Sequence, residues 1–133
     1  MNYLLDTHSF LWCLFSSDKL SAKAKEILLN DENTIYVSVV TFWEISLKYN
    51  LGKLKLTNVL PDALPELSIE SGFEILSLSE KDAASFFKLP RISHSDPFDR
   101  LLIWQAIRNN VTIITRDEAF KAYEKFGLKK IHA

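Results

Sequence analysis

Residues 35–51 read IYVSVVTFWEISLKYNL, and this stretch contains both of the periodicities on which the fold depends. Its first part, Ile35 to Val40, is a β-branched and mostly apolar run, typical of a buried strand in a parallel sheet. Its second part, Thr41 to Leu51, has apolar residues at helical spacing. Gly52 follows where a helix-terminating glycine is expected. A strand that passes directly into a helix is one half of a βαβ unit.

The same alternation continues toward both ends of the chain. We expect further strands at 3–5, 73–78 and 111–115, and a weak last one near Lys130 and Ile131. Segments of helical period separate them, at 9–15, 22–29, 60–69, 80–87, 98–109 and 118–126. Gly72 closes the helix before the third strand. This order predicts an α/β fold with a central parallel sheet of four to five strands, covered on both faces by helices.

Composition limits the classes of protein to consider. The chain has 133 residues, of which 47% are hydrophobic, and contains no repeat or linker, so we expect a single domain over residues 1–133. Its 16 Lys and Arg nearly cancel its 17 Asp and Glu. This balance excludes a disordered tail and a strongly basic binder that depends on phosphate neutralisation. It does not exclude a nuclease, because a bound divalent metal can supply positive charge at the scissile phosphate.

Cysteine use and hydropathy bear on the cellular compartment. Cys13 is the only cysteine, which fits a reducing compartment, and we expect a buried and inert thiol. The N-terminus lacks the pattern of a signal peptide, and no apolar run approaches the ~20 residues of a membrane span. We therefore expect a cytoplasmic protein with no membrane association.

Four acidic residues stand close to the ends of predicted strands. They are Asp6, Glu44, Asp99 and Asp117, and Asp96 lies nearby as a fifth. In an open α/β sheet the active site forms at the carboxyl ends of the strands, where side chains from distant parts of the sequence meet. These positions therefore predict one acidic cluster.

Helix capping is the alternative explanation for each acid taken alone. Asp96 and Pro97 have the pattern of an N-cap followed by proline at the first helical position, with Asp99 at the third position as in a capping box. Thr41 and Glu44 have the spacing of another capping box, and Asp117 is placed to cap the last helix.

Two arguments favour a metal site. Asp99 falls on the apolar stripe of its helix, where a carboxylate costs free energy unless it is paired or bound to a cation. Four converging carboxylates also repel one another unless a cation neutralises them. Lys48 can pair with Glu44 along the helix.

An all-oxygen cluster suits Mg²⁺ or Mn²⁺. Zinc is not expected, because the histidines lack a zinc-like spacing with one another or with the cysteine; they are His8, His94 and His132.

Four segments together resemble the PIN-domain ribonucleases, and within them the VapC-type toxins of bacterial toxin–antitoxin pairs. The segments are LLDTH at 4–8, SVVTFWEI at 38–45, HSDPFDRLLI at 94–103 and TRD at 115–117, with Phe120 three residues on. The resemblance runs from Asp6 to Phe120. No single segment is decisive, but their order and spacing in a chain of this length make the match specific.

The resemblance implies a three-layer α/β/α fold, divalent-metal-dependent cleavage of single-stranded or looped RNA, homodimerisation and inhibition by a partner antitoxin. By position, the catalytic and metal-binding acids of the family fall on Asp6, Glu44, Asp99 and Asp117. Asp96 is a further candidate ligand, which its capping role also explains. The near-neutral charge shows no basic groove for RNA, and this departure leaves substrate affinity open.

We expect hydrolysis of a phosphodiester by metal-activated water, because neither a catalytic triad order nor a catalytic cysteine is present. Three hydroxyl residues are candidates to orient carboxylates or water: Thr7, Thr115 and Ser38. Three basic residues are candidates for phosphate contacts, although a solvated surface position explains each of them as well: Lys48, Arg100 and Arg116.

Two other functions stay open at this point. A phosphatase with Asp6 as nucleophile is one, although such sites usually place a second acid two residues later, where this chain has His8. A non-catalytic, metal-binding α/β interaction domain is the other. Several aromatic residues belong mostly to the predicted core, while some on the first two helices are candidates for a patch that meets an antitoxin helix or a second protomer; they are Phe10, Trp12, Phe42, Trp43 and Trp104.

Overall fold

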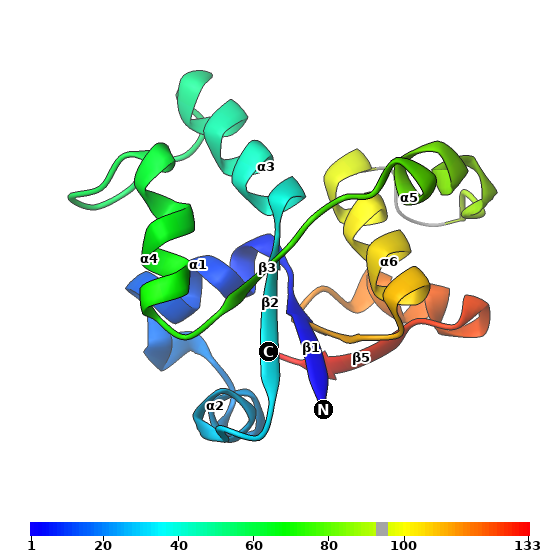
Figure 1. The fold of residues 1–133 in the computed structure, drawn as a ribbon, viewed down its shortest axis with the longest axis horizontal. Helices are drawn as coiled ribbons and strands as arrows, with labels where there is room; N and C mark the ends of the chain where they lie inside the picture. Colours follow the sequence, from blue (N-terminus) through cyan, green and yellow to red (C-terminus); the bar gives the residue numbers. More distant parts are fainter. Residues whose placement is uncertain (93–95) are drawn as a thin grey trace.

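The computed structural model describes residues 1–92 and 96–133 and contains one five-stranded parallel sheet (Figure 1). His94 and Ser95 of the HSDPFDRLLI segment lie outside the described residues. The strand order is β3-β2-β1-β4-β5, so β1 is central. The strands are β1 (Asn2–Leu5), β2 (Thr34–Ser38), β3 (Glu74–Leu76), β4 (Thr112–Thr115) and β5 (Lys129–His132). The predicted parallel sheet is confirmed.

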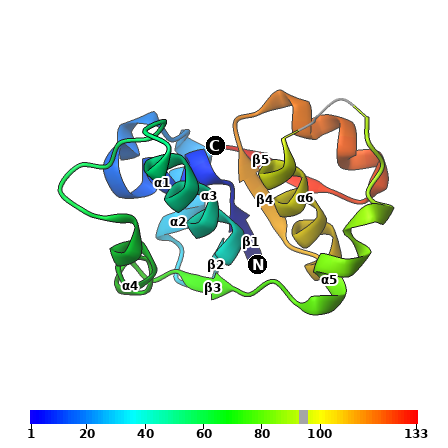
Figure 2. The ribbon, with the colours of Figure 1, turned by 90° about the horizontal axis from the view of Figure 1, so that it is seen from above.

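Helices cover both faces of the sheet, which gives the three α/β/α layers (Figures 1 and 2). The α-helices are α1 (Thr7–Phe15), α2 (Ala22–Leu29), α3 (Val39–Asn50), α4 (Leu64–Glu70), α5 (Glu80–Ser85) and α6 (Pro97–Asn109). The 3₁₀ segments are η1 (Ser17–Lys19), η2 (Pro61–Ala63), η3 (Phe86–Lys88) and η4 (Glu118–Phe126). Helices α1, α2 and α4 lie on one side of the sheet, whereas α5, α6 and η4 lie on the other.

Two predicted boundaries were wrong for a physical reason. The second strand ends at Ser38, not Val40, because the Ser38 hydroxyl accepts the amide N–H of Val40 at 3.0 Å and so caps α3 two residues early. The predicted capping box of Thr41 and Glu44 is therefore wrong, since both residues lie inside the helix. Gly52 does follow the end of α3, with a φ of +73° that favours glycine.

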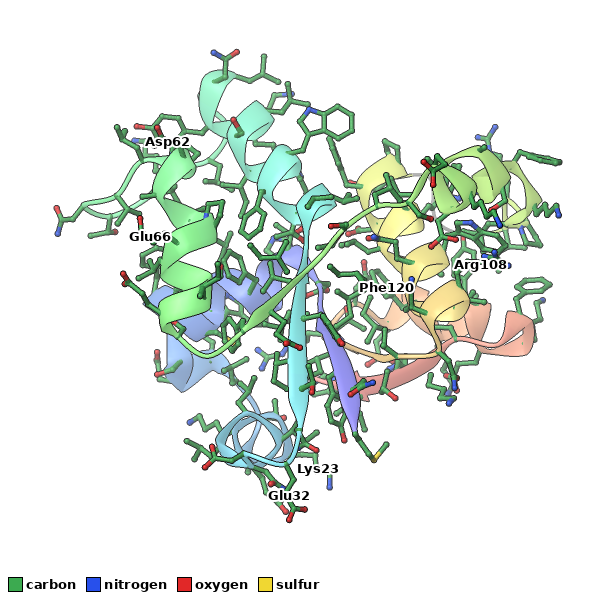
Figure 3. The ribbon with its side chains drawn as sticks, in the orientation of Figure 1. Lys23, Glu32, Asp62, Glu66, Arg108 and Phe120 are labelled. Carbon is green, nitrogen blue, oxygen red and sulfur yellow. The ribbon has the colours of Figure 1, made fainter. Side chains whose placement is uncertain are left out.

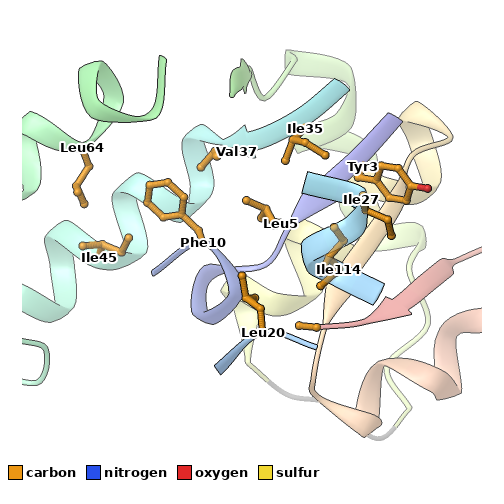
Figure 4. Packing of buried hydrophobic residues seen from close by; sticks show 12 residues of the cluster. Tyr3, Leu5, Phe10, Leu20, Ile27, Ile35, Val37, Ile45, Leu64 and Ile114 are labelled. Atoms are coloured by element: carbon orange, nitrogen blue, oxygen red, sulfur yellow. The ribbon is translucent and has the colours of Figure 1, made fainter. Parts of the chain in front are cut away.

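The core consists of two apolar clusters, one on each face of the sheet. Successive β1 residues alternate between them, as the two-residue period of a strand requires: Leu5 packs in one and Leu4 in the other. Figure 4 shows the first cluster, to which α1 contributes Phe10, α3 contributes Ile45 and strands β1 and β2 contribute Leu5 and Val37. Charged side chains such as Glu66 lie on the outside, whereas Phe120 lies within the fold (Figure 3).

None of the helices described within residues 1–92 and 96–133 combines the length and the hydrophobicity of a membrane span. The cytoplasmic location and the single domain over residues 1–133 stay predictions.

Candidate active site

Strands β2, β1 and β4 are neighbours and parallel, so their carboxyl ends open at one edge of the sheet. Leu5 of β1 pairs in register with Val37 of β2 and with Ile114 of β4. The residues that follow these three strands therefore lie at the same height along the sheet. Helix α3 continues directly from β2, and the N-terminus of α6 stands beside it at this edge (Figures 1 and 2).

Asp6 is buried at the end of β1 and is held on both carboxylate oxygens. Its Oδ1 accepts the amide N–H of Ser9 at 2.9 Å, which makes Asp6 the N-cap of α1. Its Oδ2 accepts the Thr115 hydroxyl from β4 at 2.6 Å. Burial raises the pKa of Asp6, although hydrogen bonds from Ser9 and Thr115 oppose that shift. The carboxylate is thus fixed between β1 and β4.

Glu44 is buried in the second turn of α3 and contacts two partners. Its Oε1 accepts the Thr7 hydroxyl at 2.6 Å, and its Oε2 forms an ion pair with Lys48. The Thr41 hydroxyl lies 3.3 Å from that of Thr7. Burial by itself would lower the pKa of Lys48, but the hydrogen bond and the charge of Glu44 raise it above its ordinary value. The predicted pairing of Lys48 with Glu44 is confirmed.

Asp99 occupies the first turn of α6, where both burial and neighbouring acids act on its carboxylate. Asp96 caps the helix, since its Oδ1 accepts the amide N–H groups of Phe98 at 2.8 Å and Asp99 at 3.0 Å. The residues that follow on the same face of α6 are buried: Leu102, Ile103 and Ala106. Burial, and then the charges of four acids, raise the pKa of Asp99 to about 8; these acids are Asp96, Glu44, Asp6 and Asp117.

Asp117 lies on the exposed side of the same edge, after β4. It caps η4 by accepting the amide N–H of Ala119 at 2.9 Å. The Thr115 hydroxyl accepts the amide N–H of Asp117 at 3.1 Å while it donates to Asp6. A hollow of about 310 Å³ opens here, lined by Asp6, His8, Trp12, Arg116 and Asp117. One threonine therefore connects two of the predicted acids beside a cavity.

The donor set fits a hard divalent cation, because it consists of carboxylate oxygens whose mutual repulsion is visible at Asp99. Among residues 1–92 and 96–133, no three His, Cys, Asp or Glu side chains lie close enough to hold one ion together. Glu44 is turned toward Thr7 and Lys48, and Asp6 toward Thr115 and Ser9. Binding an ion at this edge would therefore require some carboxylates to leave these partners.

The structure separates the predicted auxiliary residues into two groups. Thr7, Thr115 and Lys48 contact acids of the site directly. Arg100 is instead buried, donates to the Leu89 carbonyl at 2.9 Å and lies over the Phe86 ring.

Two further predicted residues also have structural contacts. Arg116 lies over the Trp12 ring and donates to the carbonyls of Lys19 and Ala133. Ser38 caps α3 and donates to the buried Gln105 side chain of α6. The buried Arg100 is therefore left out of the set of phosphate contacts, whereas Arg116 is exposed, lines the hollow with Asp6 and Asp117, and stays a candidate.

Sequence reasoning missed three residues that support this edge. Ser9 contributes both its amide N–H to Asp6 and its hydroxyl to the Ile114 carbonyl at 3.0 Å. Thr41 places a second hydroxyl beside Thr7. Gln105 links α6 to β2 through Ser38. The position of Ser9, three residues after Asp6, was a usable signal for a capped helix, whereas the contact of Gln105 depends on tertiary packing.

Comparison with known proteins gives one family match and several similar structures. A sequence profile described as PIN domain matches residues 3–126. A comparison with curated proteins found no match.

Three solved structures illustrate the similarity of fold. VapBC-1 from nontypeable Haemophilus influenzae has a TM-score of 0.69 and 19% identity, covering 99% of this chain and 98% of that one. VapBC2 from Rickettsia felis, bound to a DNA fragment from its promoter, has a TM-score of 0.66 and 21% identity over 99% and 98%. FitAcB from Neisseria gonorrhoeae has a TM-score of 0.62 and 23% identity over 97% and 96%.

Proposed function

The chain belongs to the PIN-domain family, and from this premise we propose that it is a Mg²⁺- or Mn²⁺-dependent endoribonuclease. One observation carries the proposal: burial, and then the charges of acids from separate segments, raise the pKa of Asp99 to about 8. A cluster of like charges costs stability, so it is retained where a cation or a reaction needs it. A metal-dependent nuclease provides both reasons, because its acids bind the cation and the cation takes part in the reaction.

The residues that would hold the ion are Asp6, Glu44, Asp99 and Asp117. A divalent cation held there would supply an activated water and would neutralise charge on the phosphodiester. Thr115 keeps Asp6 in position, and Thr7 does the same for Glu44. Asp96 positions the first turn of α6, and its carboxylate is engaged in that cap.

A toxin of a toxin–antitoxin pair is the cellular role that we propose. The similar structures include complexes called VapBC and FitAcB. By extension, a cognate antitoxin would bind this chain and keep it inactive, and the active form would be a homodimer in the cytoplasm. The RNA substrate follows from the family resemblance and from an acidic site that needs a metal to approach a phosphate.

The test is cleavage of RNA by the purified chain with Mn²⁺, with Mg²⁺ and with excess chelator. We expect cleavage that requires the metal and is lost in Asp6→Asn and Asp99→Asn, both with circular dichroism like that of the wild type. Full activity in chelator, or in either variant, would refute the proposed mechanism. A phosphoenzyme trapped on Asp6 would instead support a phosphatase, although both oxygens of Asp6 already accept hydrogen bonds.

A further inference from the structure

An aromatic pair, one exposed ring and one half-buried ring, lies directly beside the acidic cluster. Trp43 precedes Glu44 on α3, and 61% of its surface is exposed. Phe98 precedes Asp99 on α6 and packs edge-on against Trp43, with ring centroids 5.1 Å apart and planes at 73°. A tryptophan buries more apolar area than most side chains, so leaving it in water forgoes stability that a core position would provide. Its exposure leaves an aromatic surface beside the acids that a planar group could cover.

Lys48 connects this pair to the acids. Its ammonium forms the ion pair with Glu44 and lies 5.8 Å from the centroid of the Phe98 ring. Trp43, Phe98 and Lys48, which we call the aromatic platform, thus form a continuous surface that ends at a proposed metal ligand. A ligand ring that packs on the platform would therefore lie next to the phosphodiester that reacts at the acidic residues.

The space beside the platform is small and apolar. The hollow measures about 200 Å³ and is lined by Trp43, Ala83, Phe86, Pro97, Phe98 and Leu101. This volume is below that of pockets that enclose drug-sized ligands, which start at about 300 Å³. It suits one planar ring better than a protein helix, which needs a groove several turns long.

We propose that the aromatic platform is a subsite that stacks one nucleobase next to the scissile phosphate. The inference rests on the proposed nuclease function and adds a base-binding subsite to it. Aromatic side chains that stack bases are the usual means of holding single-stranded RNA without reading its sequence.

Binding of a labelled single-stranded oligoadenylate, measured by fluorescence anisotropy with Mn²⁺ and with Asp6→Asn in every protein compared, tests the platform without cleavage. We expect Trp43→Ala to weaken binding by roughly 5- to 100-fold, the range for loss of one stacked base. Trp43→Phe should retain most of the affinity. Tyr49→Ala is the matched control, because Tyr49 is an exposed aromatic residue on the same helix that lines a different hollow. It should bind like the wild type.

An abasic oligonucleotide shows whether the ring acts through a base. The difference between wild type and Trp43→Ala should disappear when the base that occupies the platform is removed. Equal affinity of wild type and Trp43→Ala for oligoadenylate overturns the inference, as does a loss that persists on a fully abasic strand. Unchanged RNA binding with lost antitoxin binding would assign the platform to a protein partner and also overturn it.

The same experiment separates this inference from the proposed function. If the wild type cleaves no RNA with Mn²⁺ but the anisotropy differences hold, the platform stands and the nuclease assignment fails. If the wild type cleaves RNA and Trp43→Ala binds and cleaves it equally well, the nuclease assignment stands and the platform fails.

Discussion

The Thr115 hydroxyl, at the end of β4, donates a 2.6 Å hydrogen bond to Oδ2 of Asp6, at the end of β1. The two residues are 109 positions apart in sequence, and the bond connects neighbouring strands at the edge where the acids meet. Because Thr115 also accepts the amide N–H of Asp117, one hydroxyl sets the positions of two proposed metal ligands.

Thr115→Val should therefore slow RNA cleavage markedly while the protein stays folded. Valine keeps the β-branched shape but leaves Asp6 without its partner, and loss of such an orienting contact typically costs 10- to 100-fold in activity or metal affinity. The free energy of unfolding should fall by only about 1–2 kcal/mol. Thr115→Ser, which keeps the hydroxyl, should retain most activity. Cleavage rates and urea unfolding of the three proteins check this prediction, and equal rates in all three would contradict it.

Asp99 predicts an unusual dependence of stability on pH in metal-free protein. Its pKa is about 8 in the folded chain against an ordinary 3.8, so the folded state retains a proton that the unfolded state has lost between those values. Stability should therefore fall as pH rises from about 4 to 8. Asp99→Asn removes this term, so its Tm should exceed that of the wild type by roughly 3–8 °C at pH 8.

The difference in Tm between wild type and Asp99→Asn should vanish only below about pH 3, where Asp99 is protonated in both the folded and the unfolded state. Asp62→Asn, at an exposed acid on η2, is the control and should show no such trend. Thermal unfolding in chelator across this pH range measures all three proteins. A wild type that is at least as stable as Asp99→Asn at pH 8 would contradict the prediction, because it would show that ionised Asp99 does not destabilise the folded protein.

The order of strands and helices could be predicted from the sequence because it depends on local period. The β-branched run at 35–37 and the apolar stripe of α6 signal their own structure. The end of β2 could not be placed, because the choice between strand and helix at Val39 and Val40 depends on a cap from Ser38. The last predicted helix, 118–126, forms as 3₁₀ turns, a distinction that side-chain period does not make.

The site could be predicted only as far as its acids. Position after a strand identifies Asp6, and the apolar stripe identifies Asp99 as unusual. The partners of these acids come from other strands and helices, so a single sequence does not show that Thr115 holds Asp6. Arg100 shows the converse error, since its charge suggested a phosphate contact but its side chain is buried against Phe86.

Cys13 should react slowly with thiol reagents in the folded protein. Burial, and then the charge of Asp6, raise the pKa of its thiol to about 12, so little thiolate exists at pH 8. We expect modification by a disulfide reagent to be slower by on the order of 100-fold or more than in urea-unfolded chain. Stopped-flow absorbance measurements on the folded and the urea-unfolded protein check this prediction. Similar rates would show that the thiol of the folded protein is accessible and ionised.

Lys48 should compete with the metal for Glu44. In the structure its ammonium is the counter-charge of that carboxylate, so an ion can engage Glu44 fully only when the pair opens. Lys48→Met keeps the length of the side chain and removes the charge. We therefore expect Mn²⁺ to bind the variant about 3- to 10-fold more tightly at low salt, which corresponds to the 0.7–1.4 kcal/mol scale of a partly exposed ion pair.

The metal-free Lys48→Met protein should at the same time be less stable than the wild type, because Glu44 then lies buried without a partner charge. Added Mn²⁺ should restore more stability to the variant than to the wild type, since ligand binding stabilises in proportion to affinity. Lys53→Met, at an exposed lysine just past α3, controls for the loss of one positive charge and should change neither quantity. Isothermal titration and thermal unfolding measure both effects. Weaker Mn²⁺ binding by Lys48→Met would mean that the lysine supports the metal instead of displacing it.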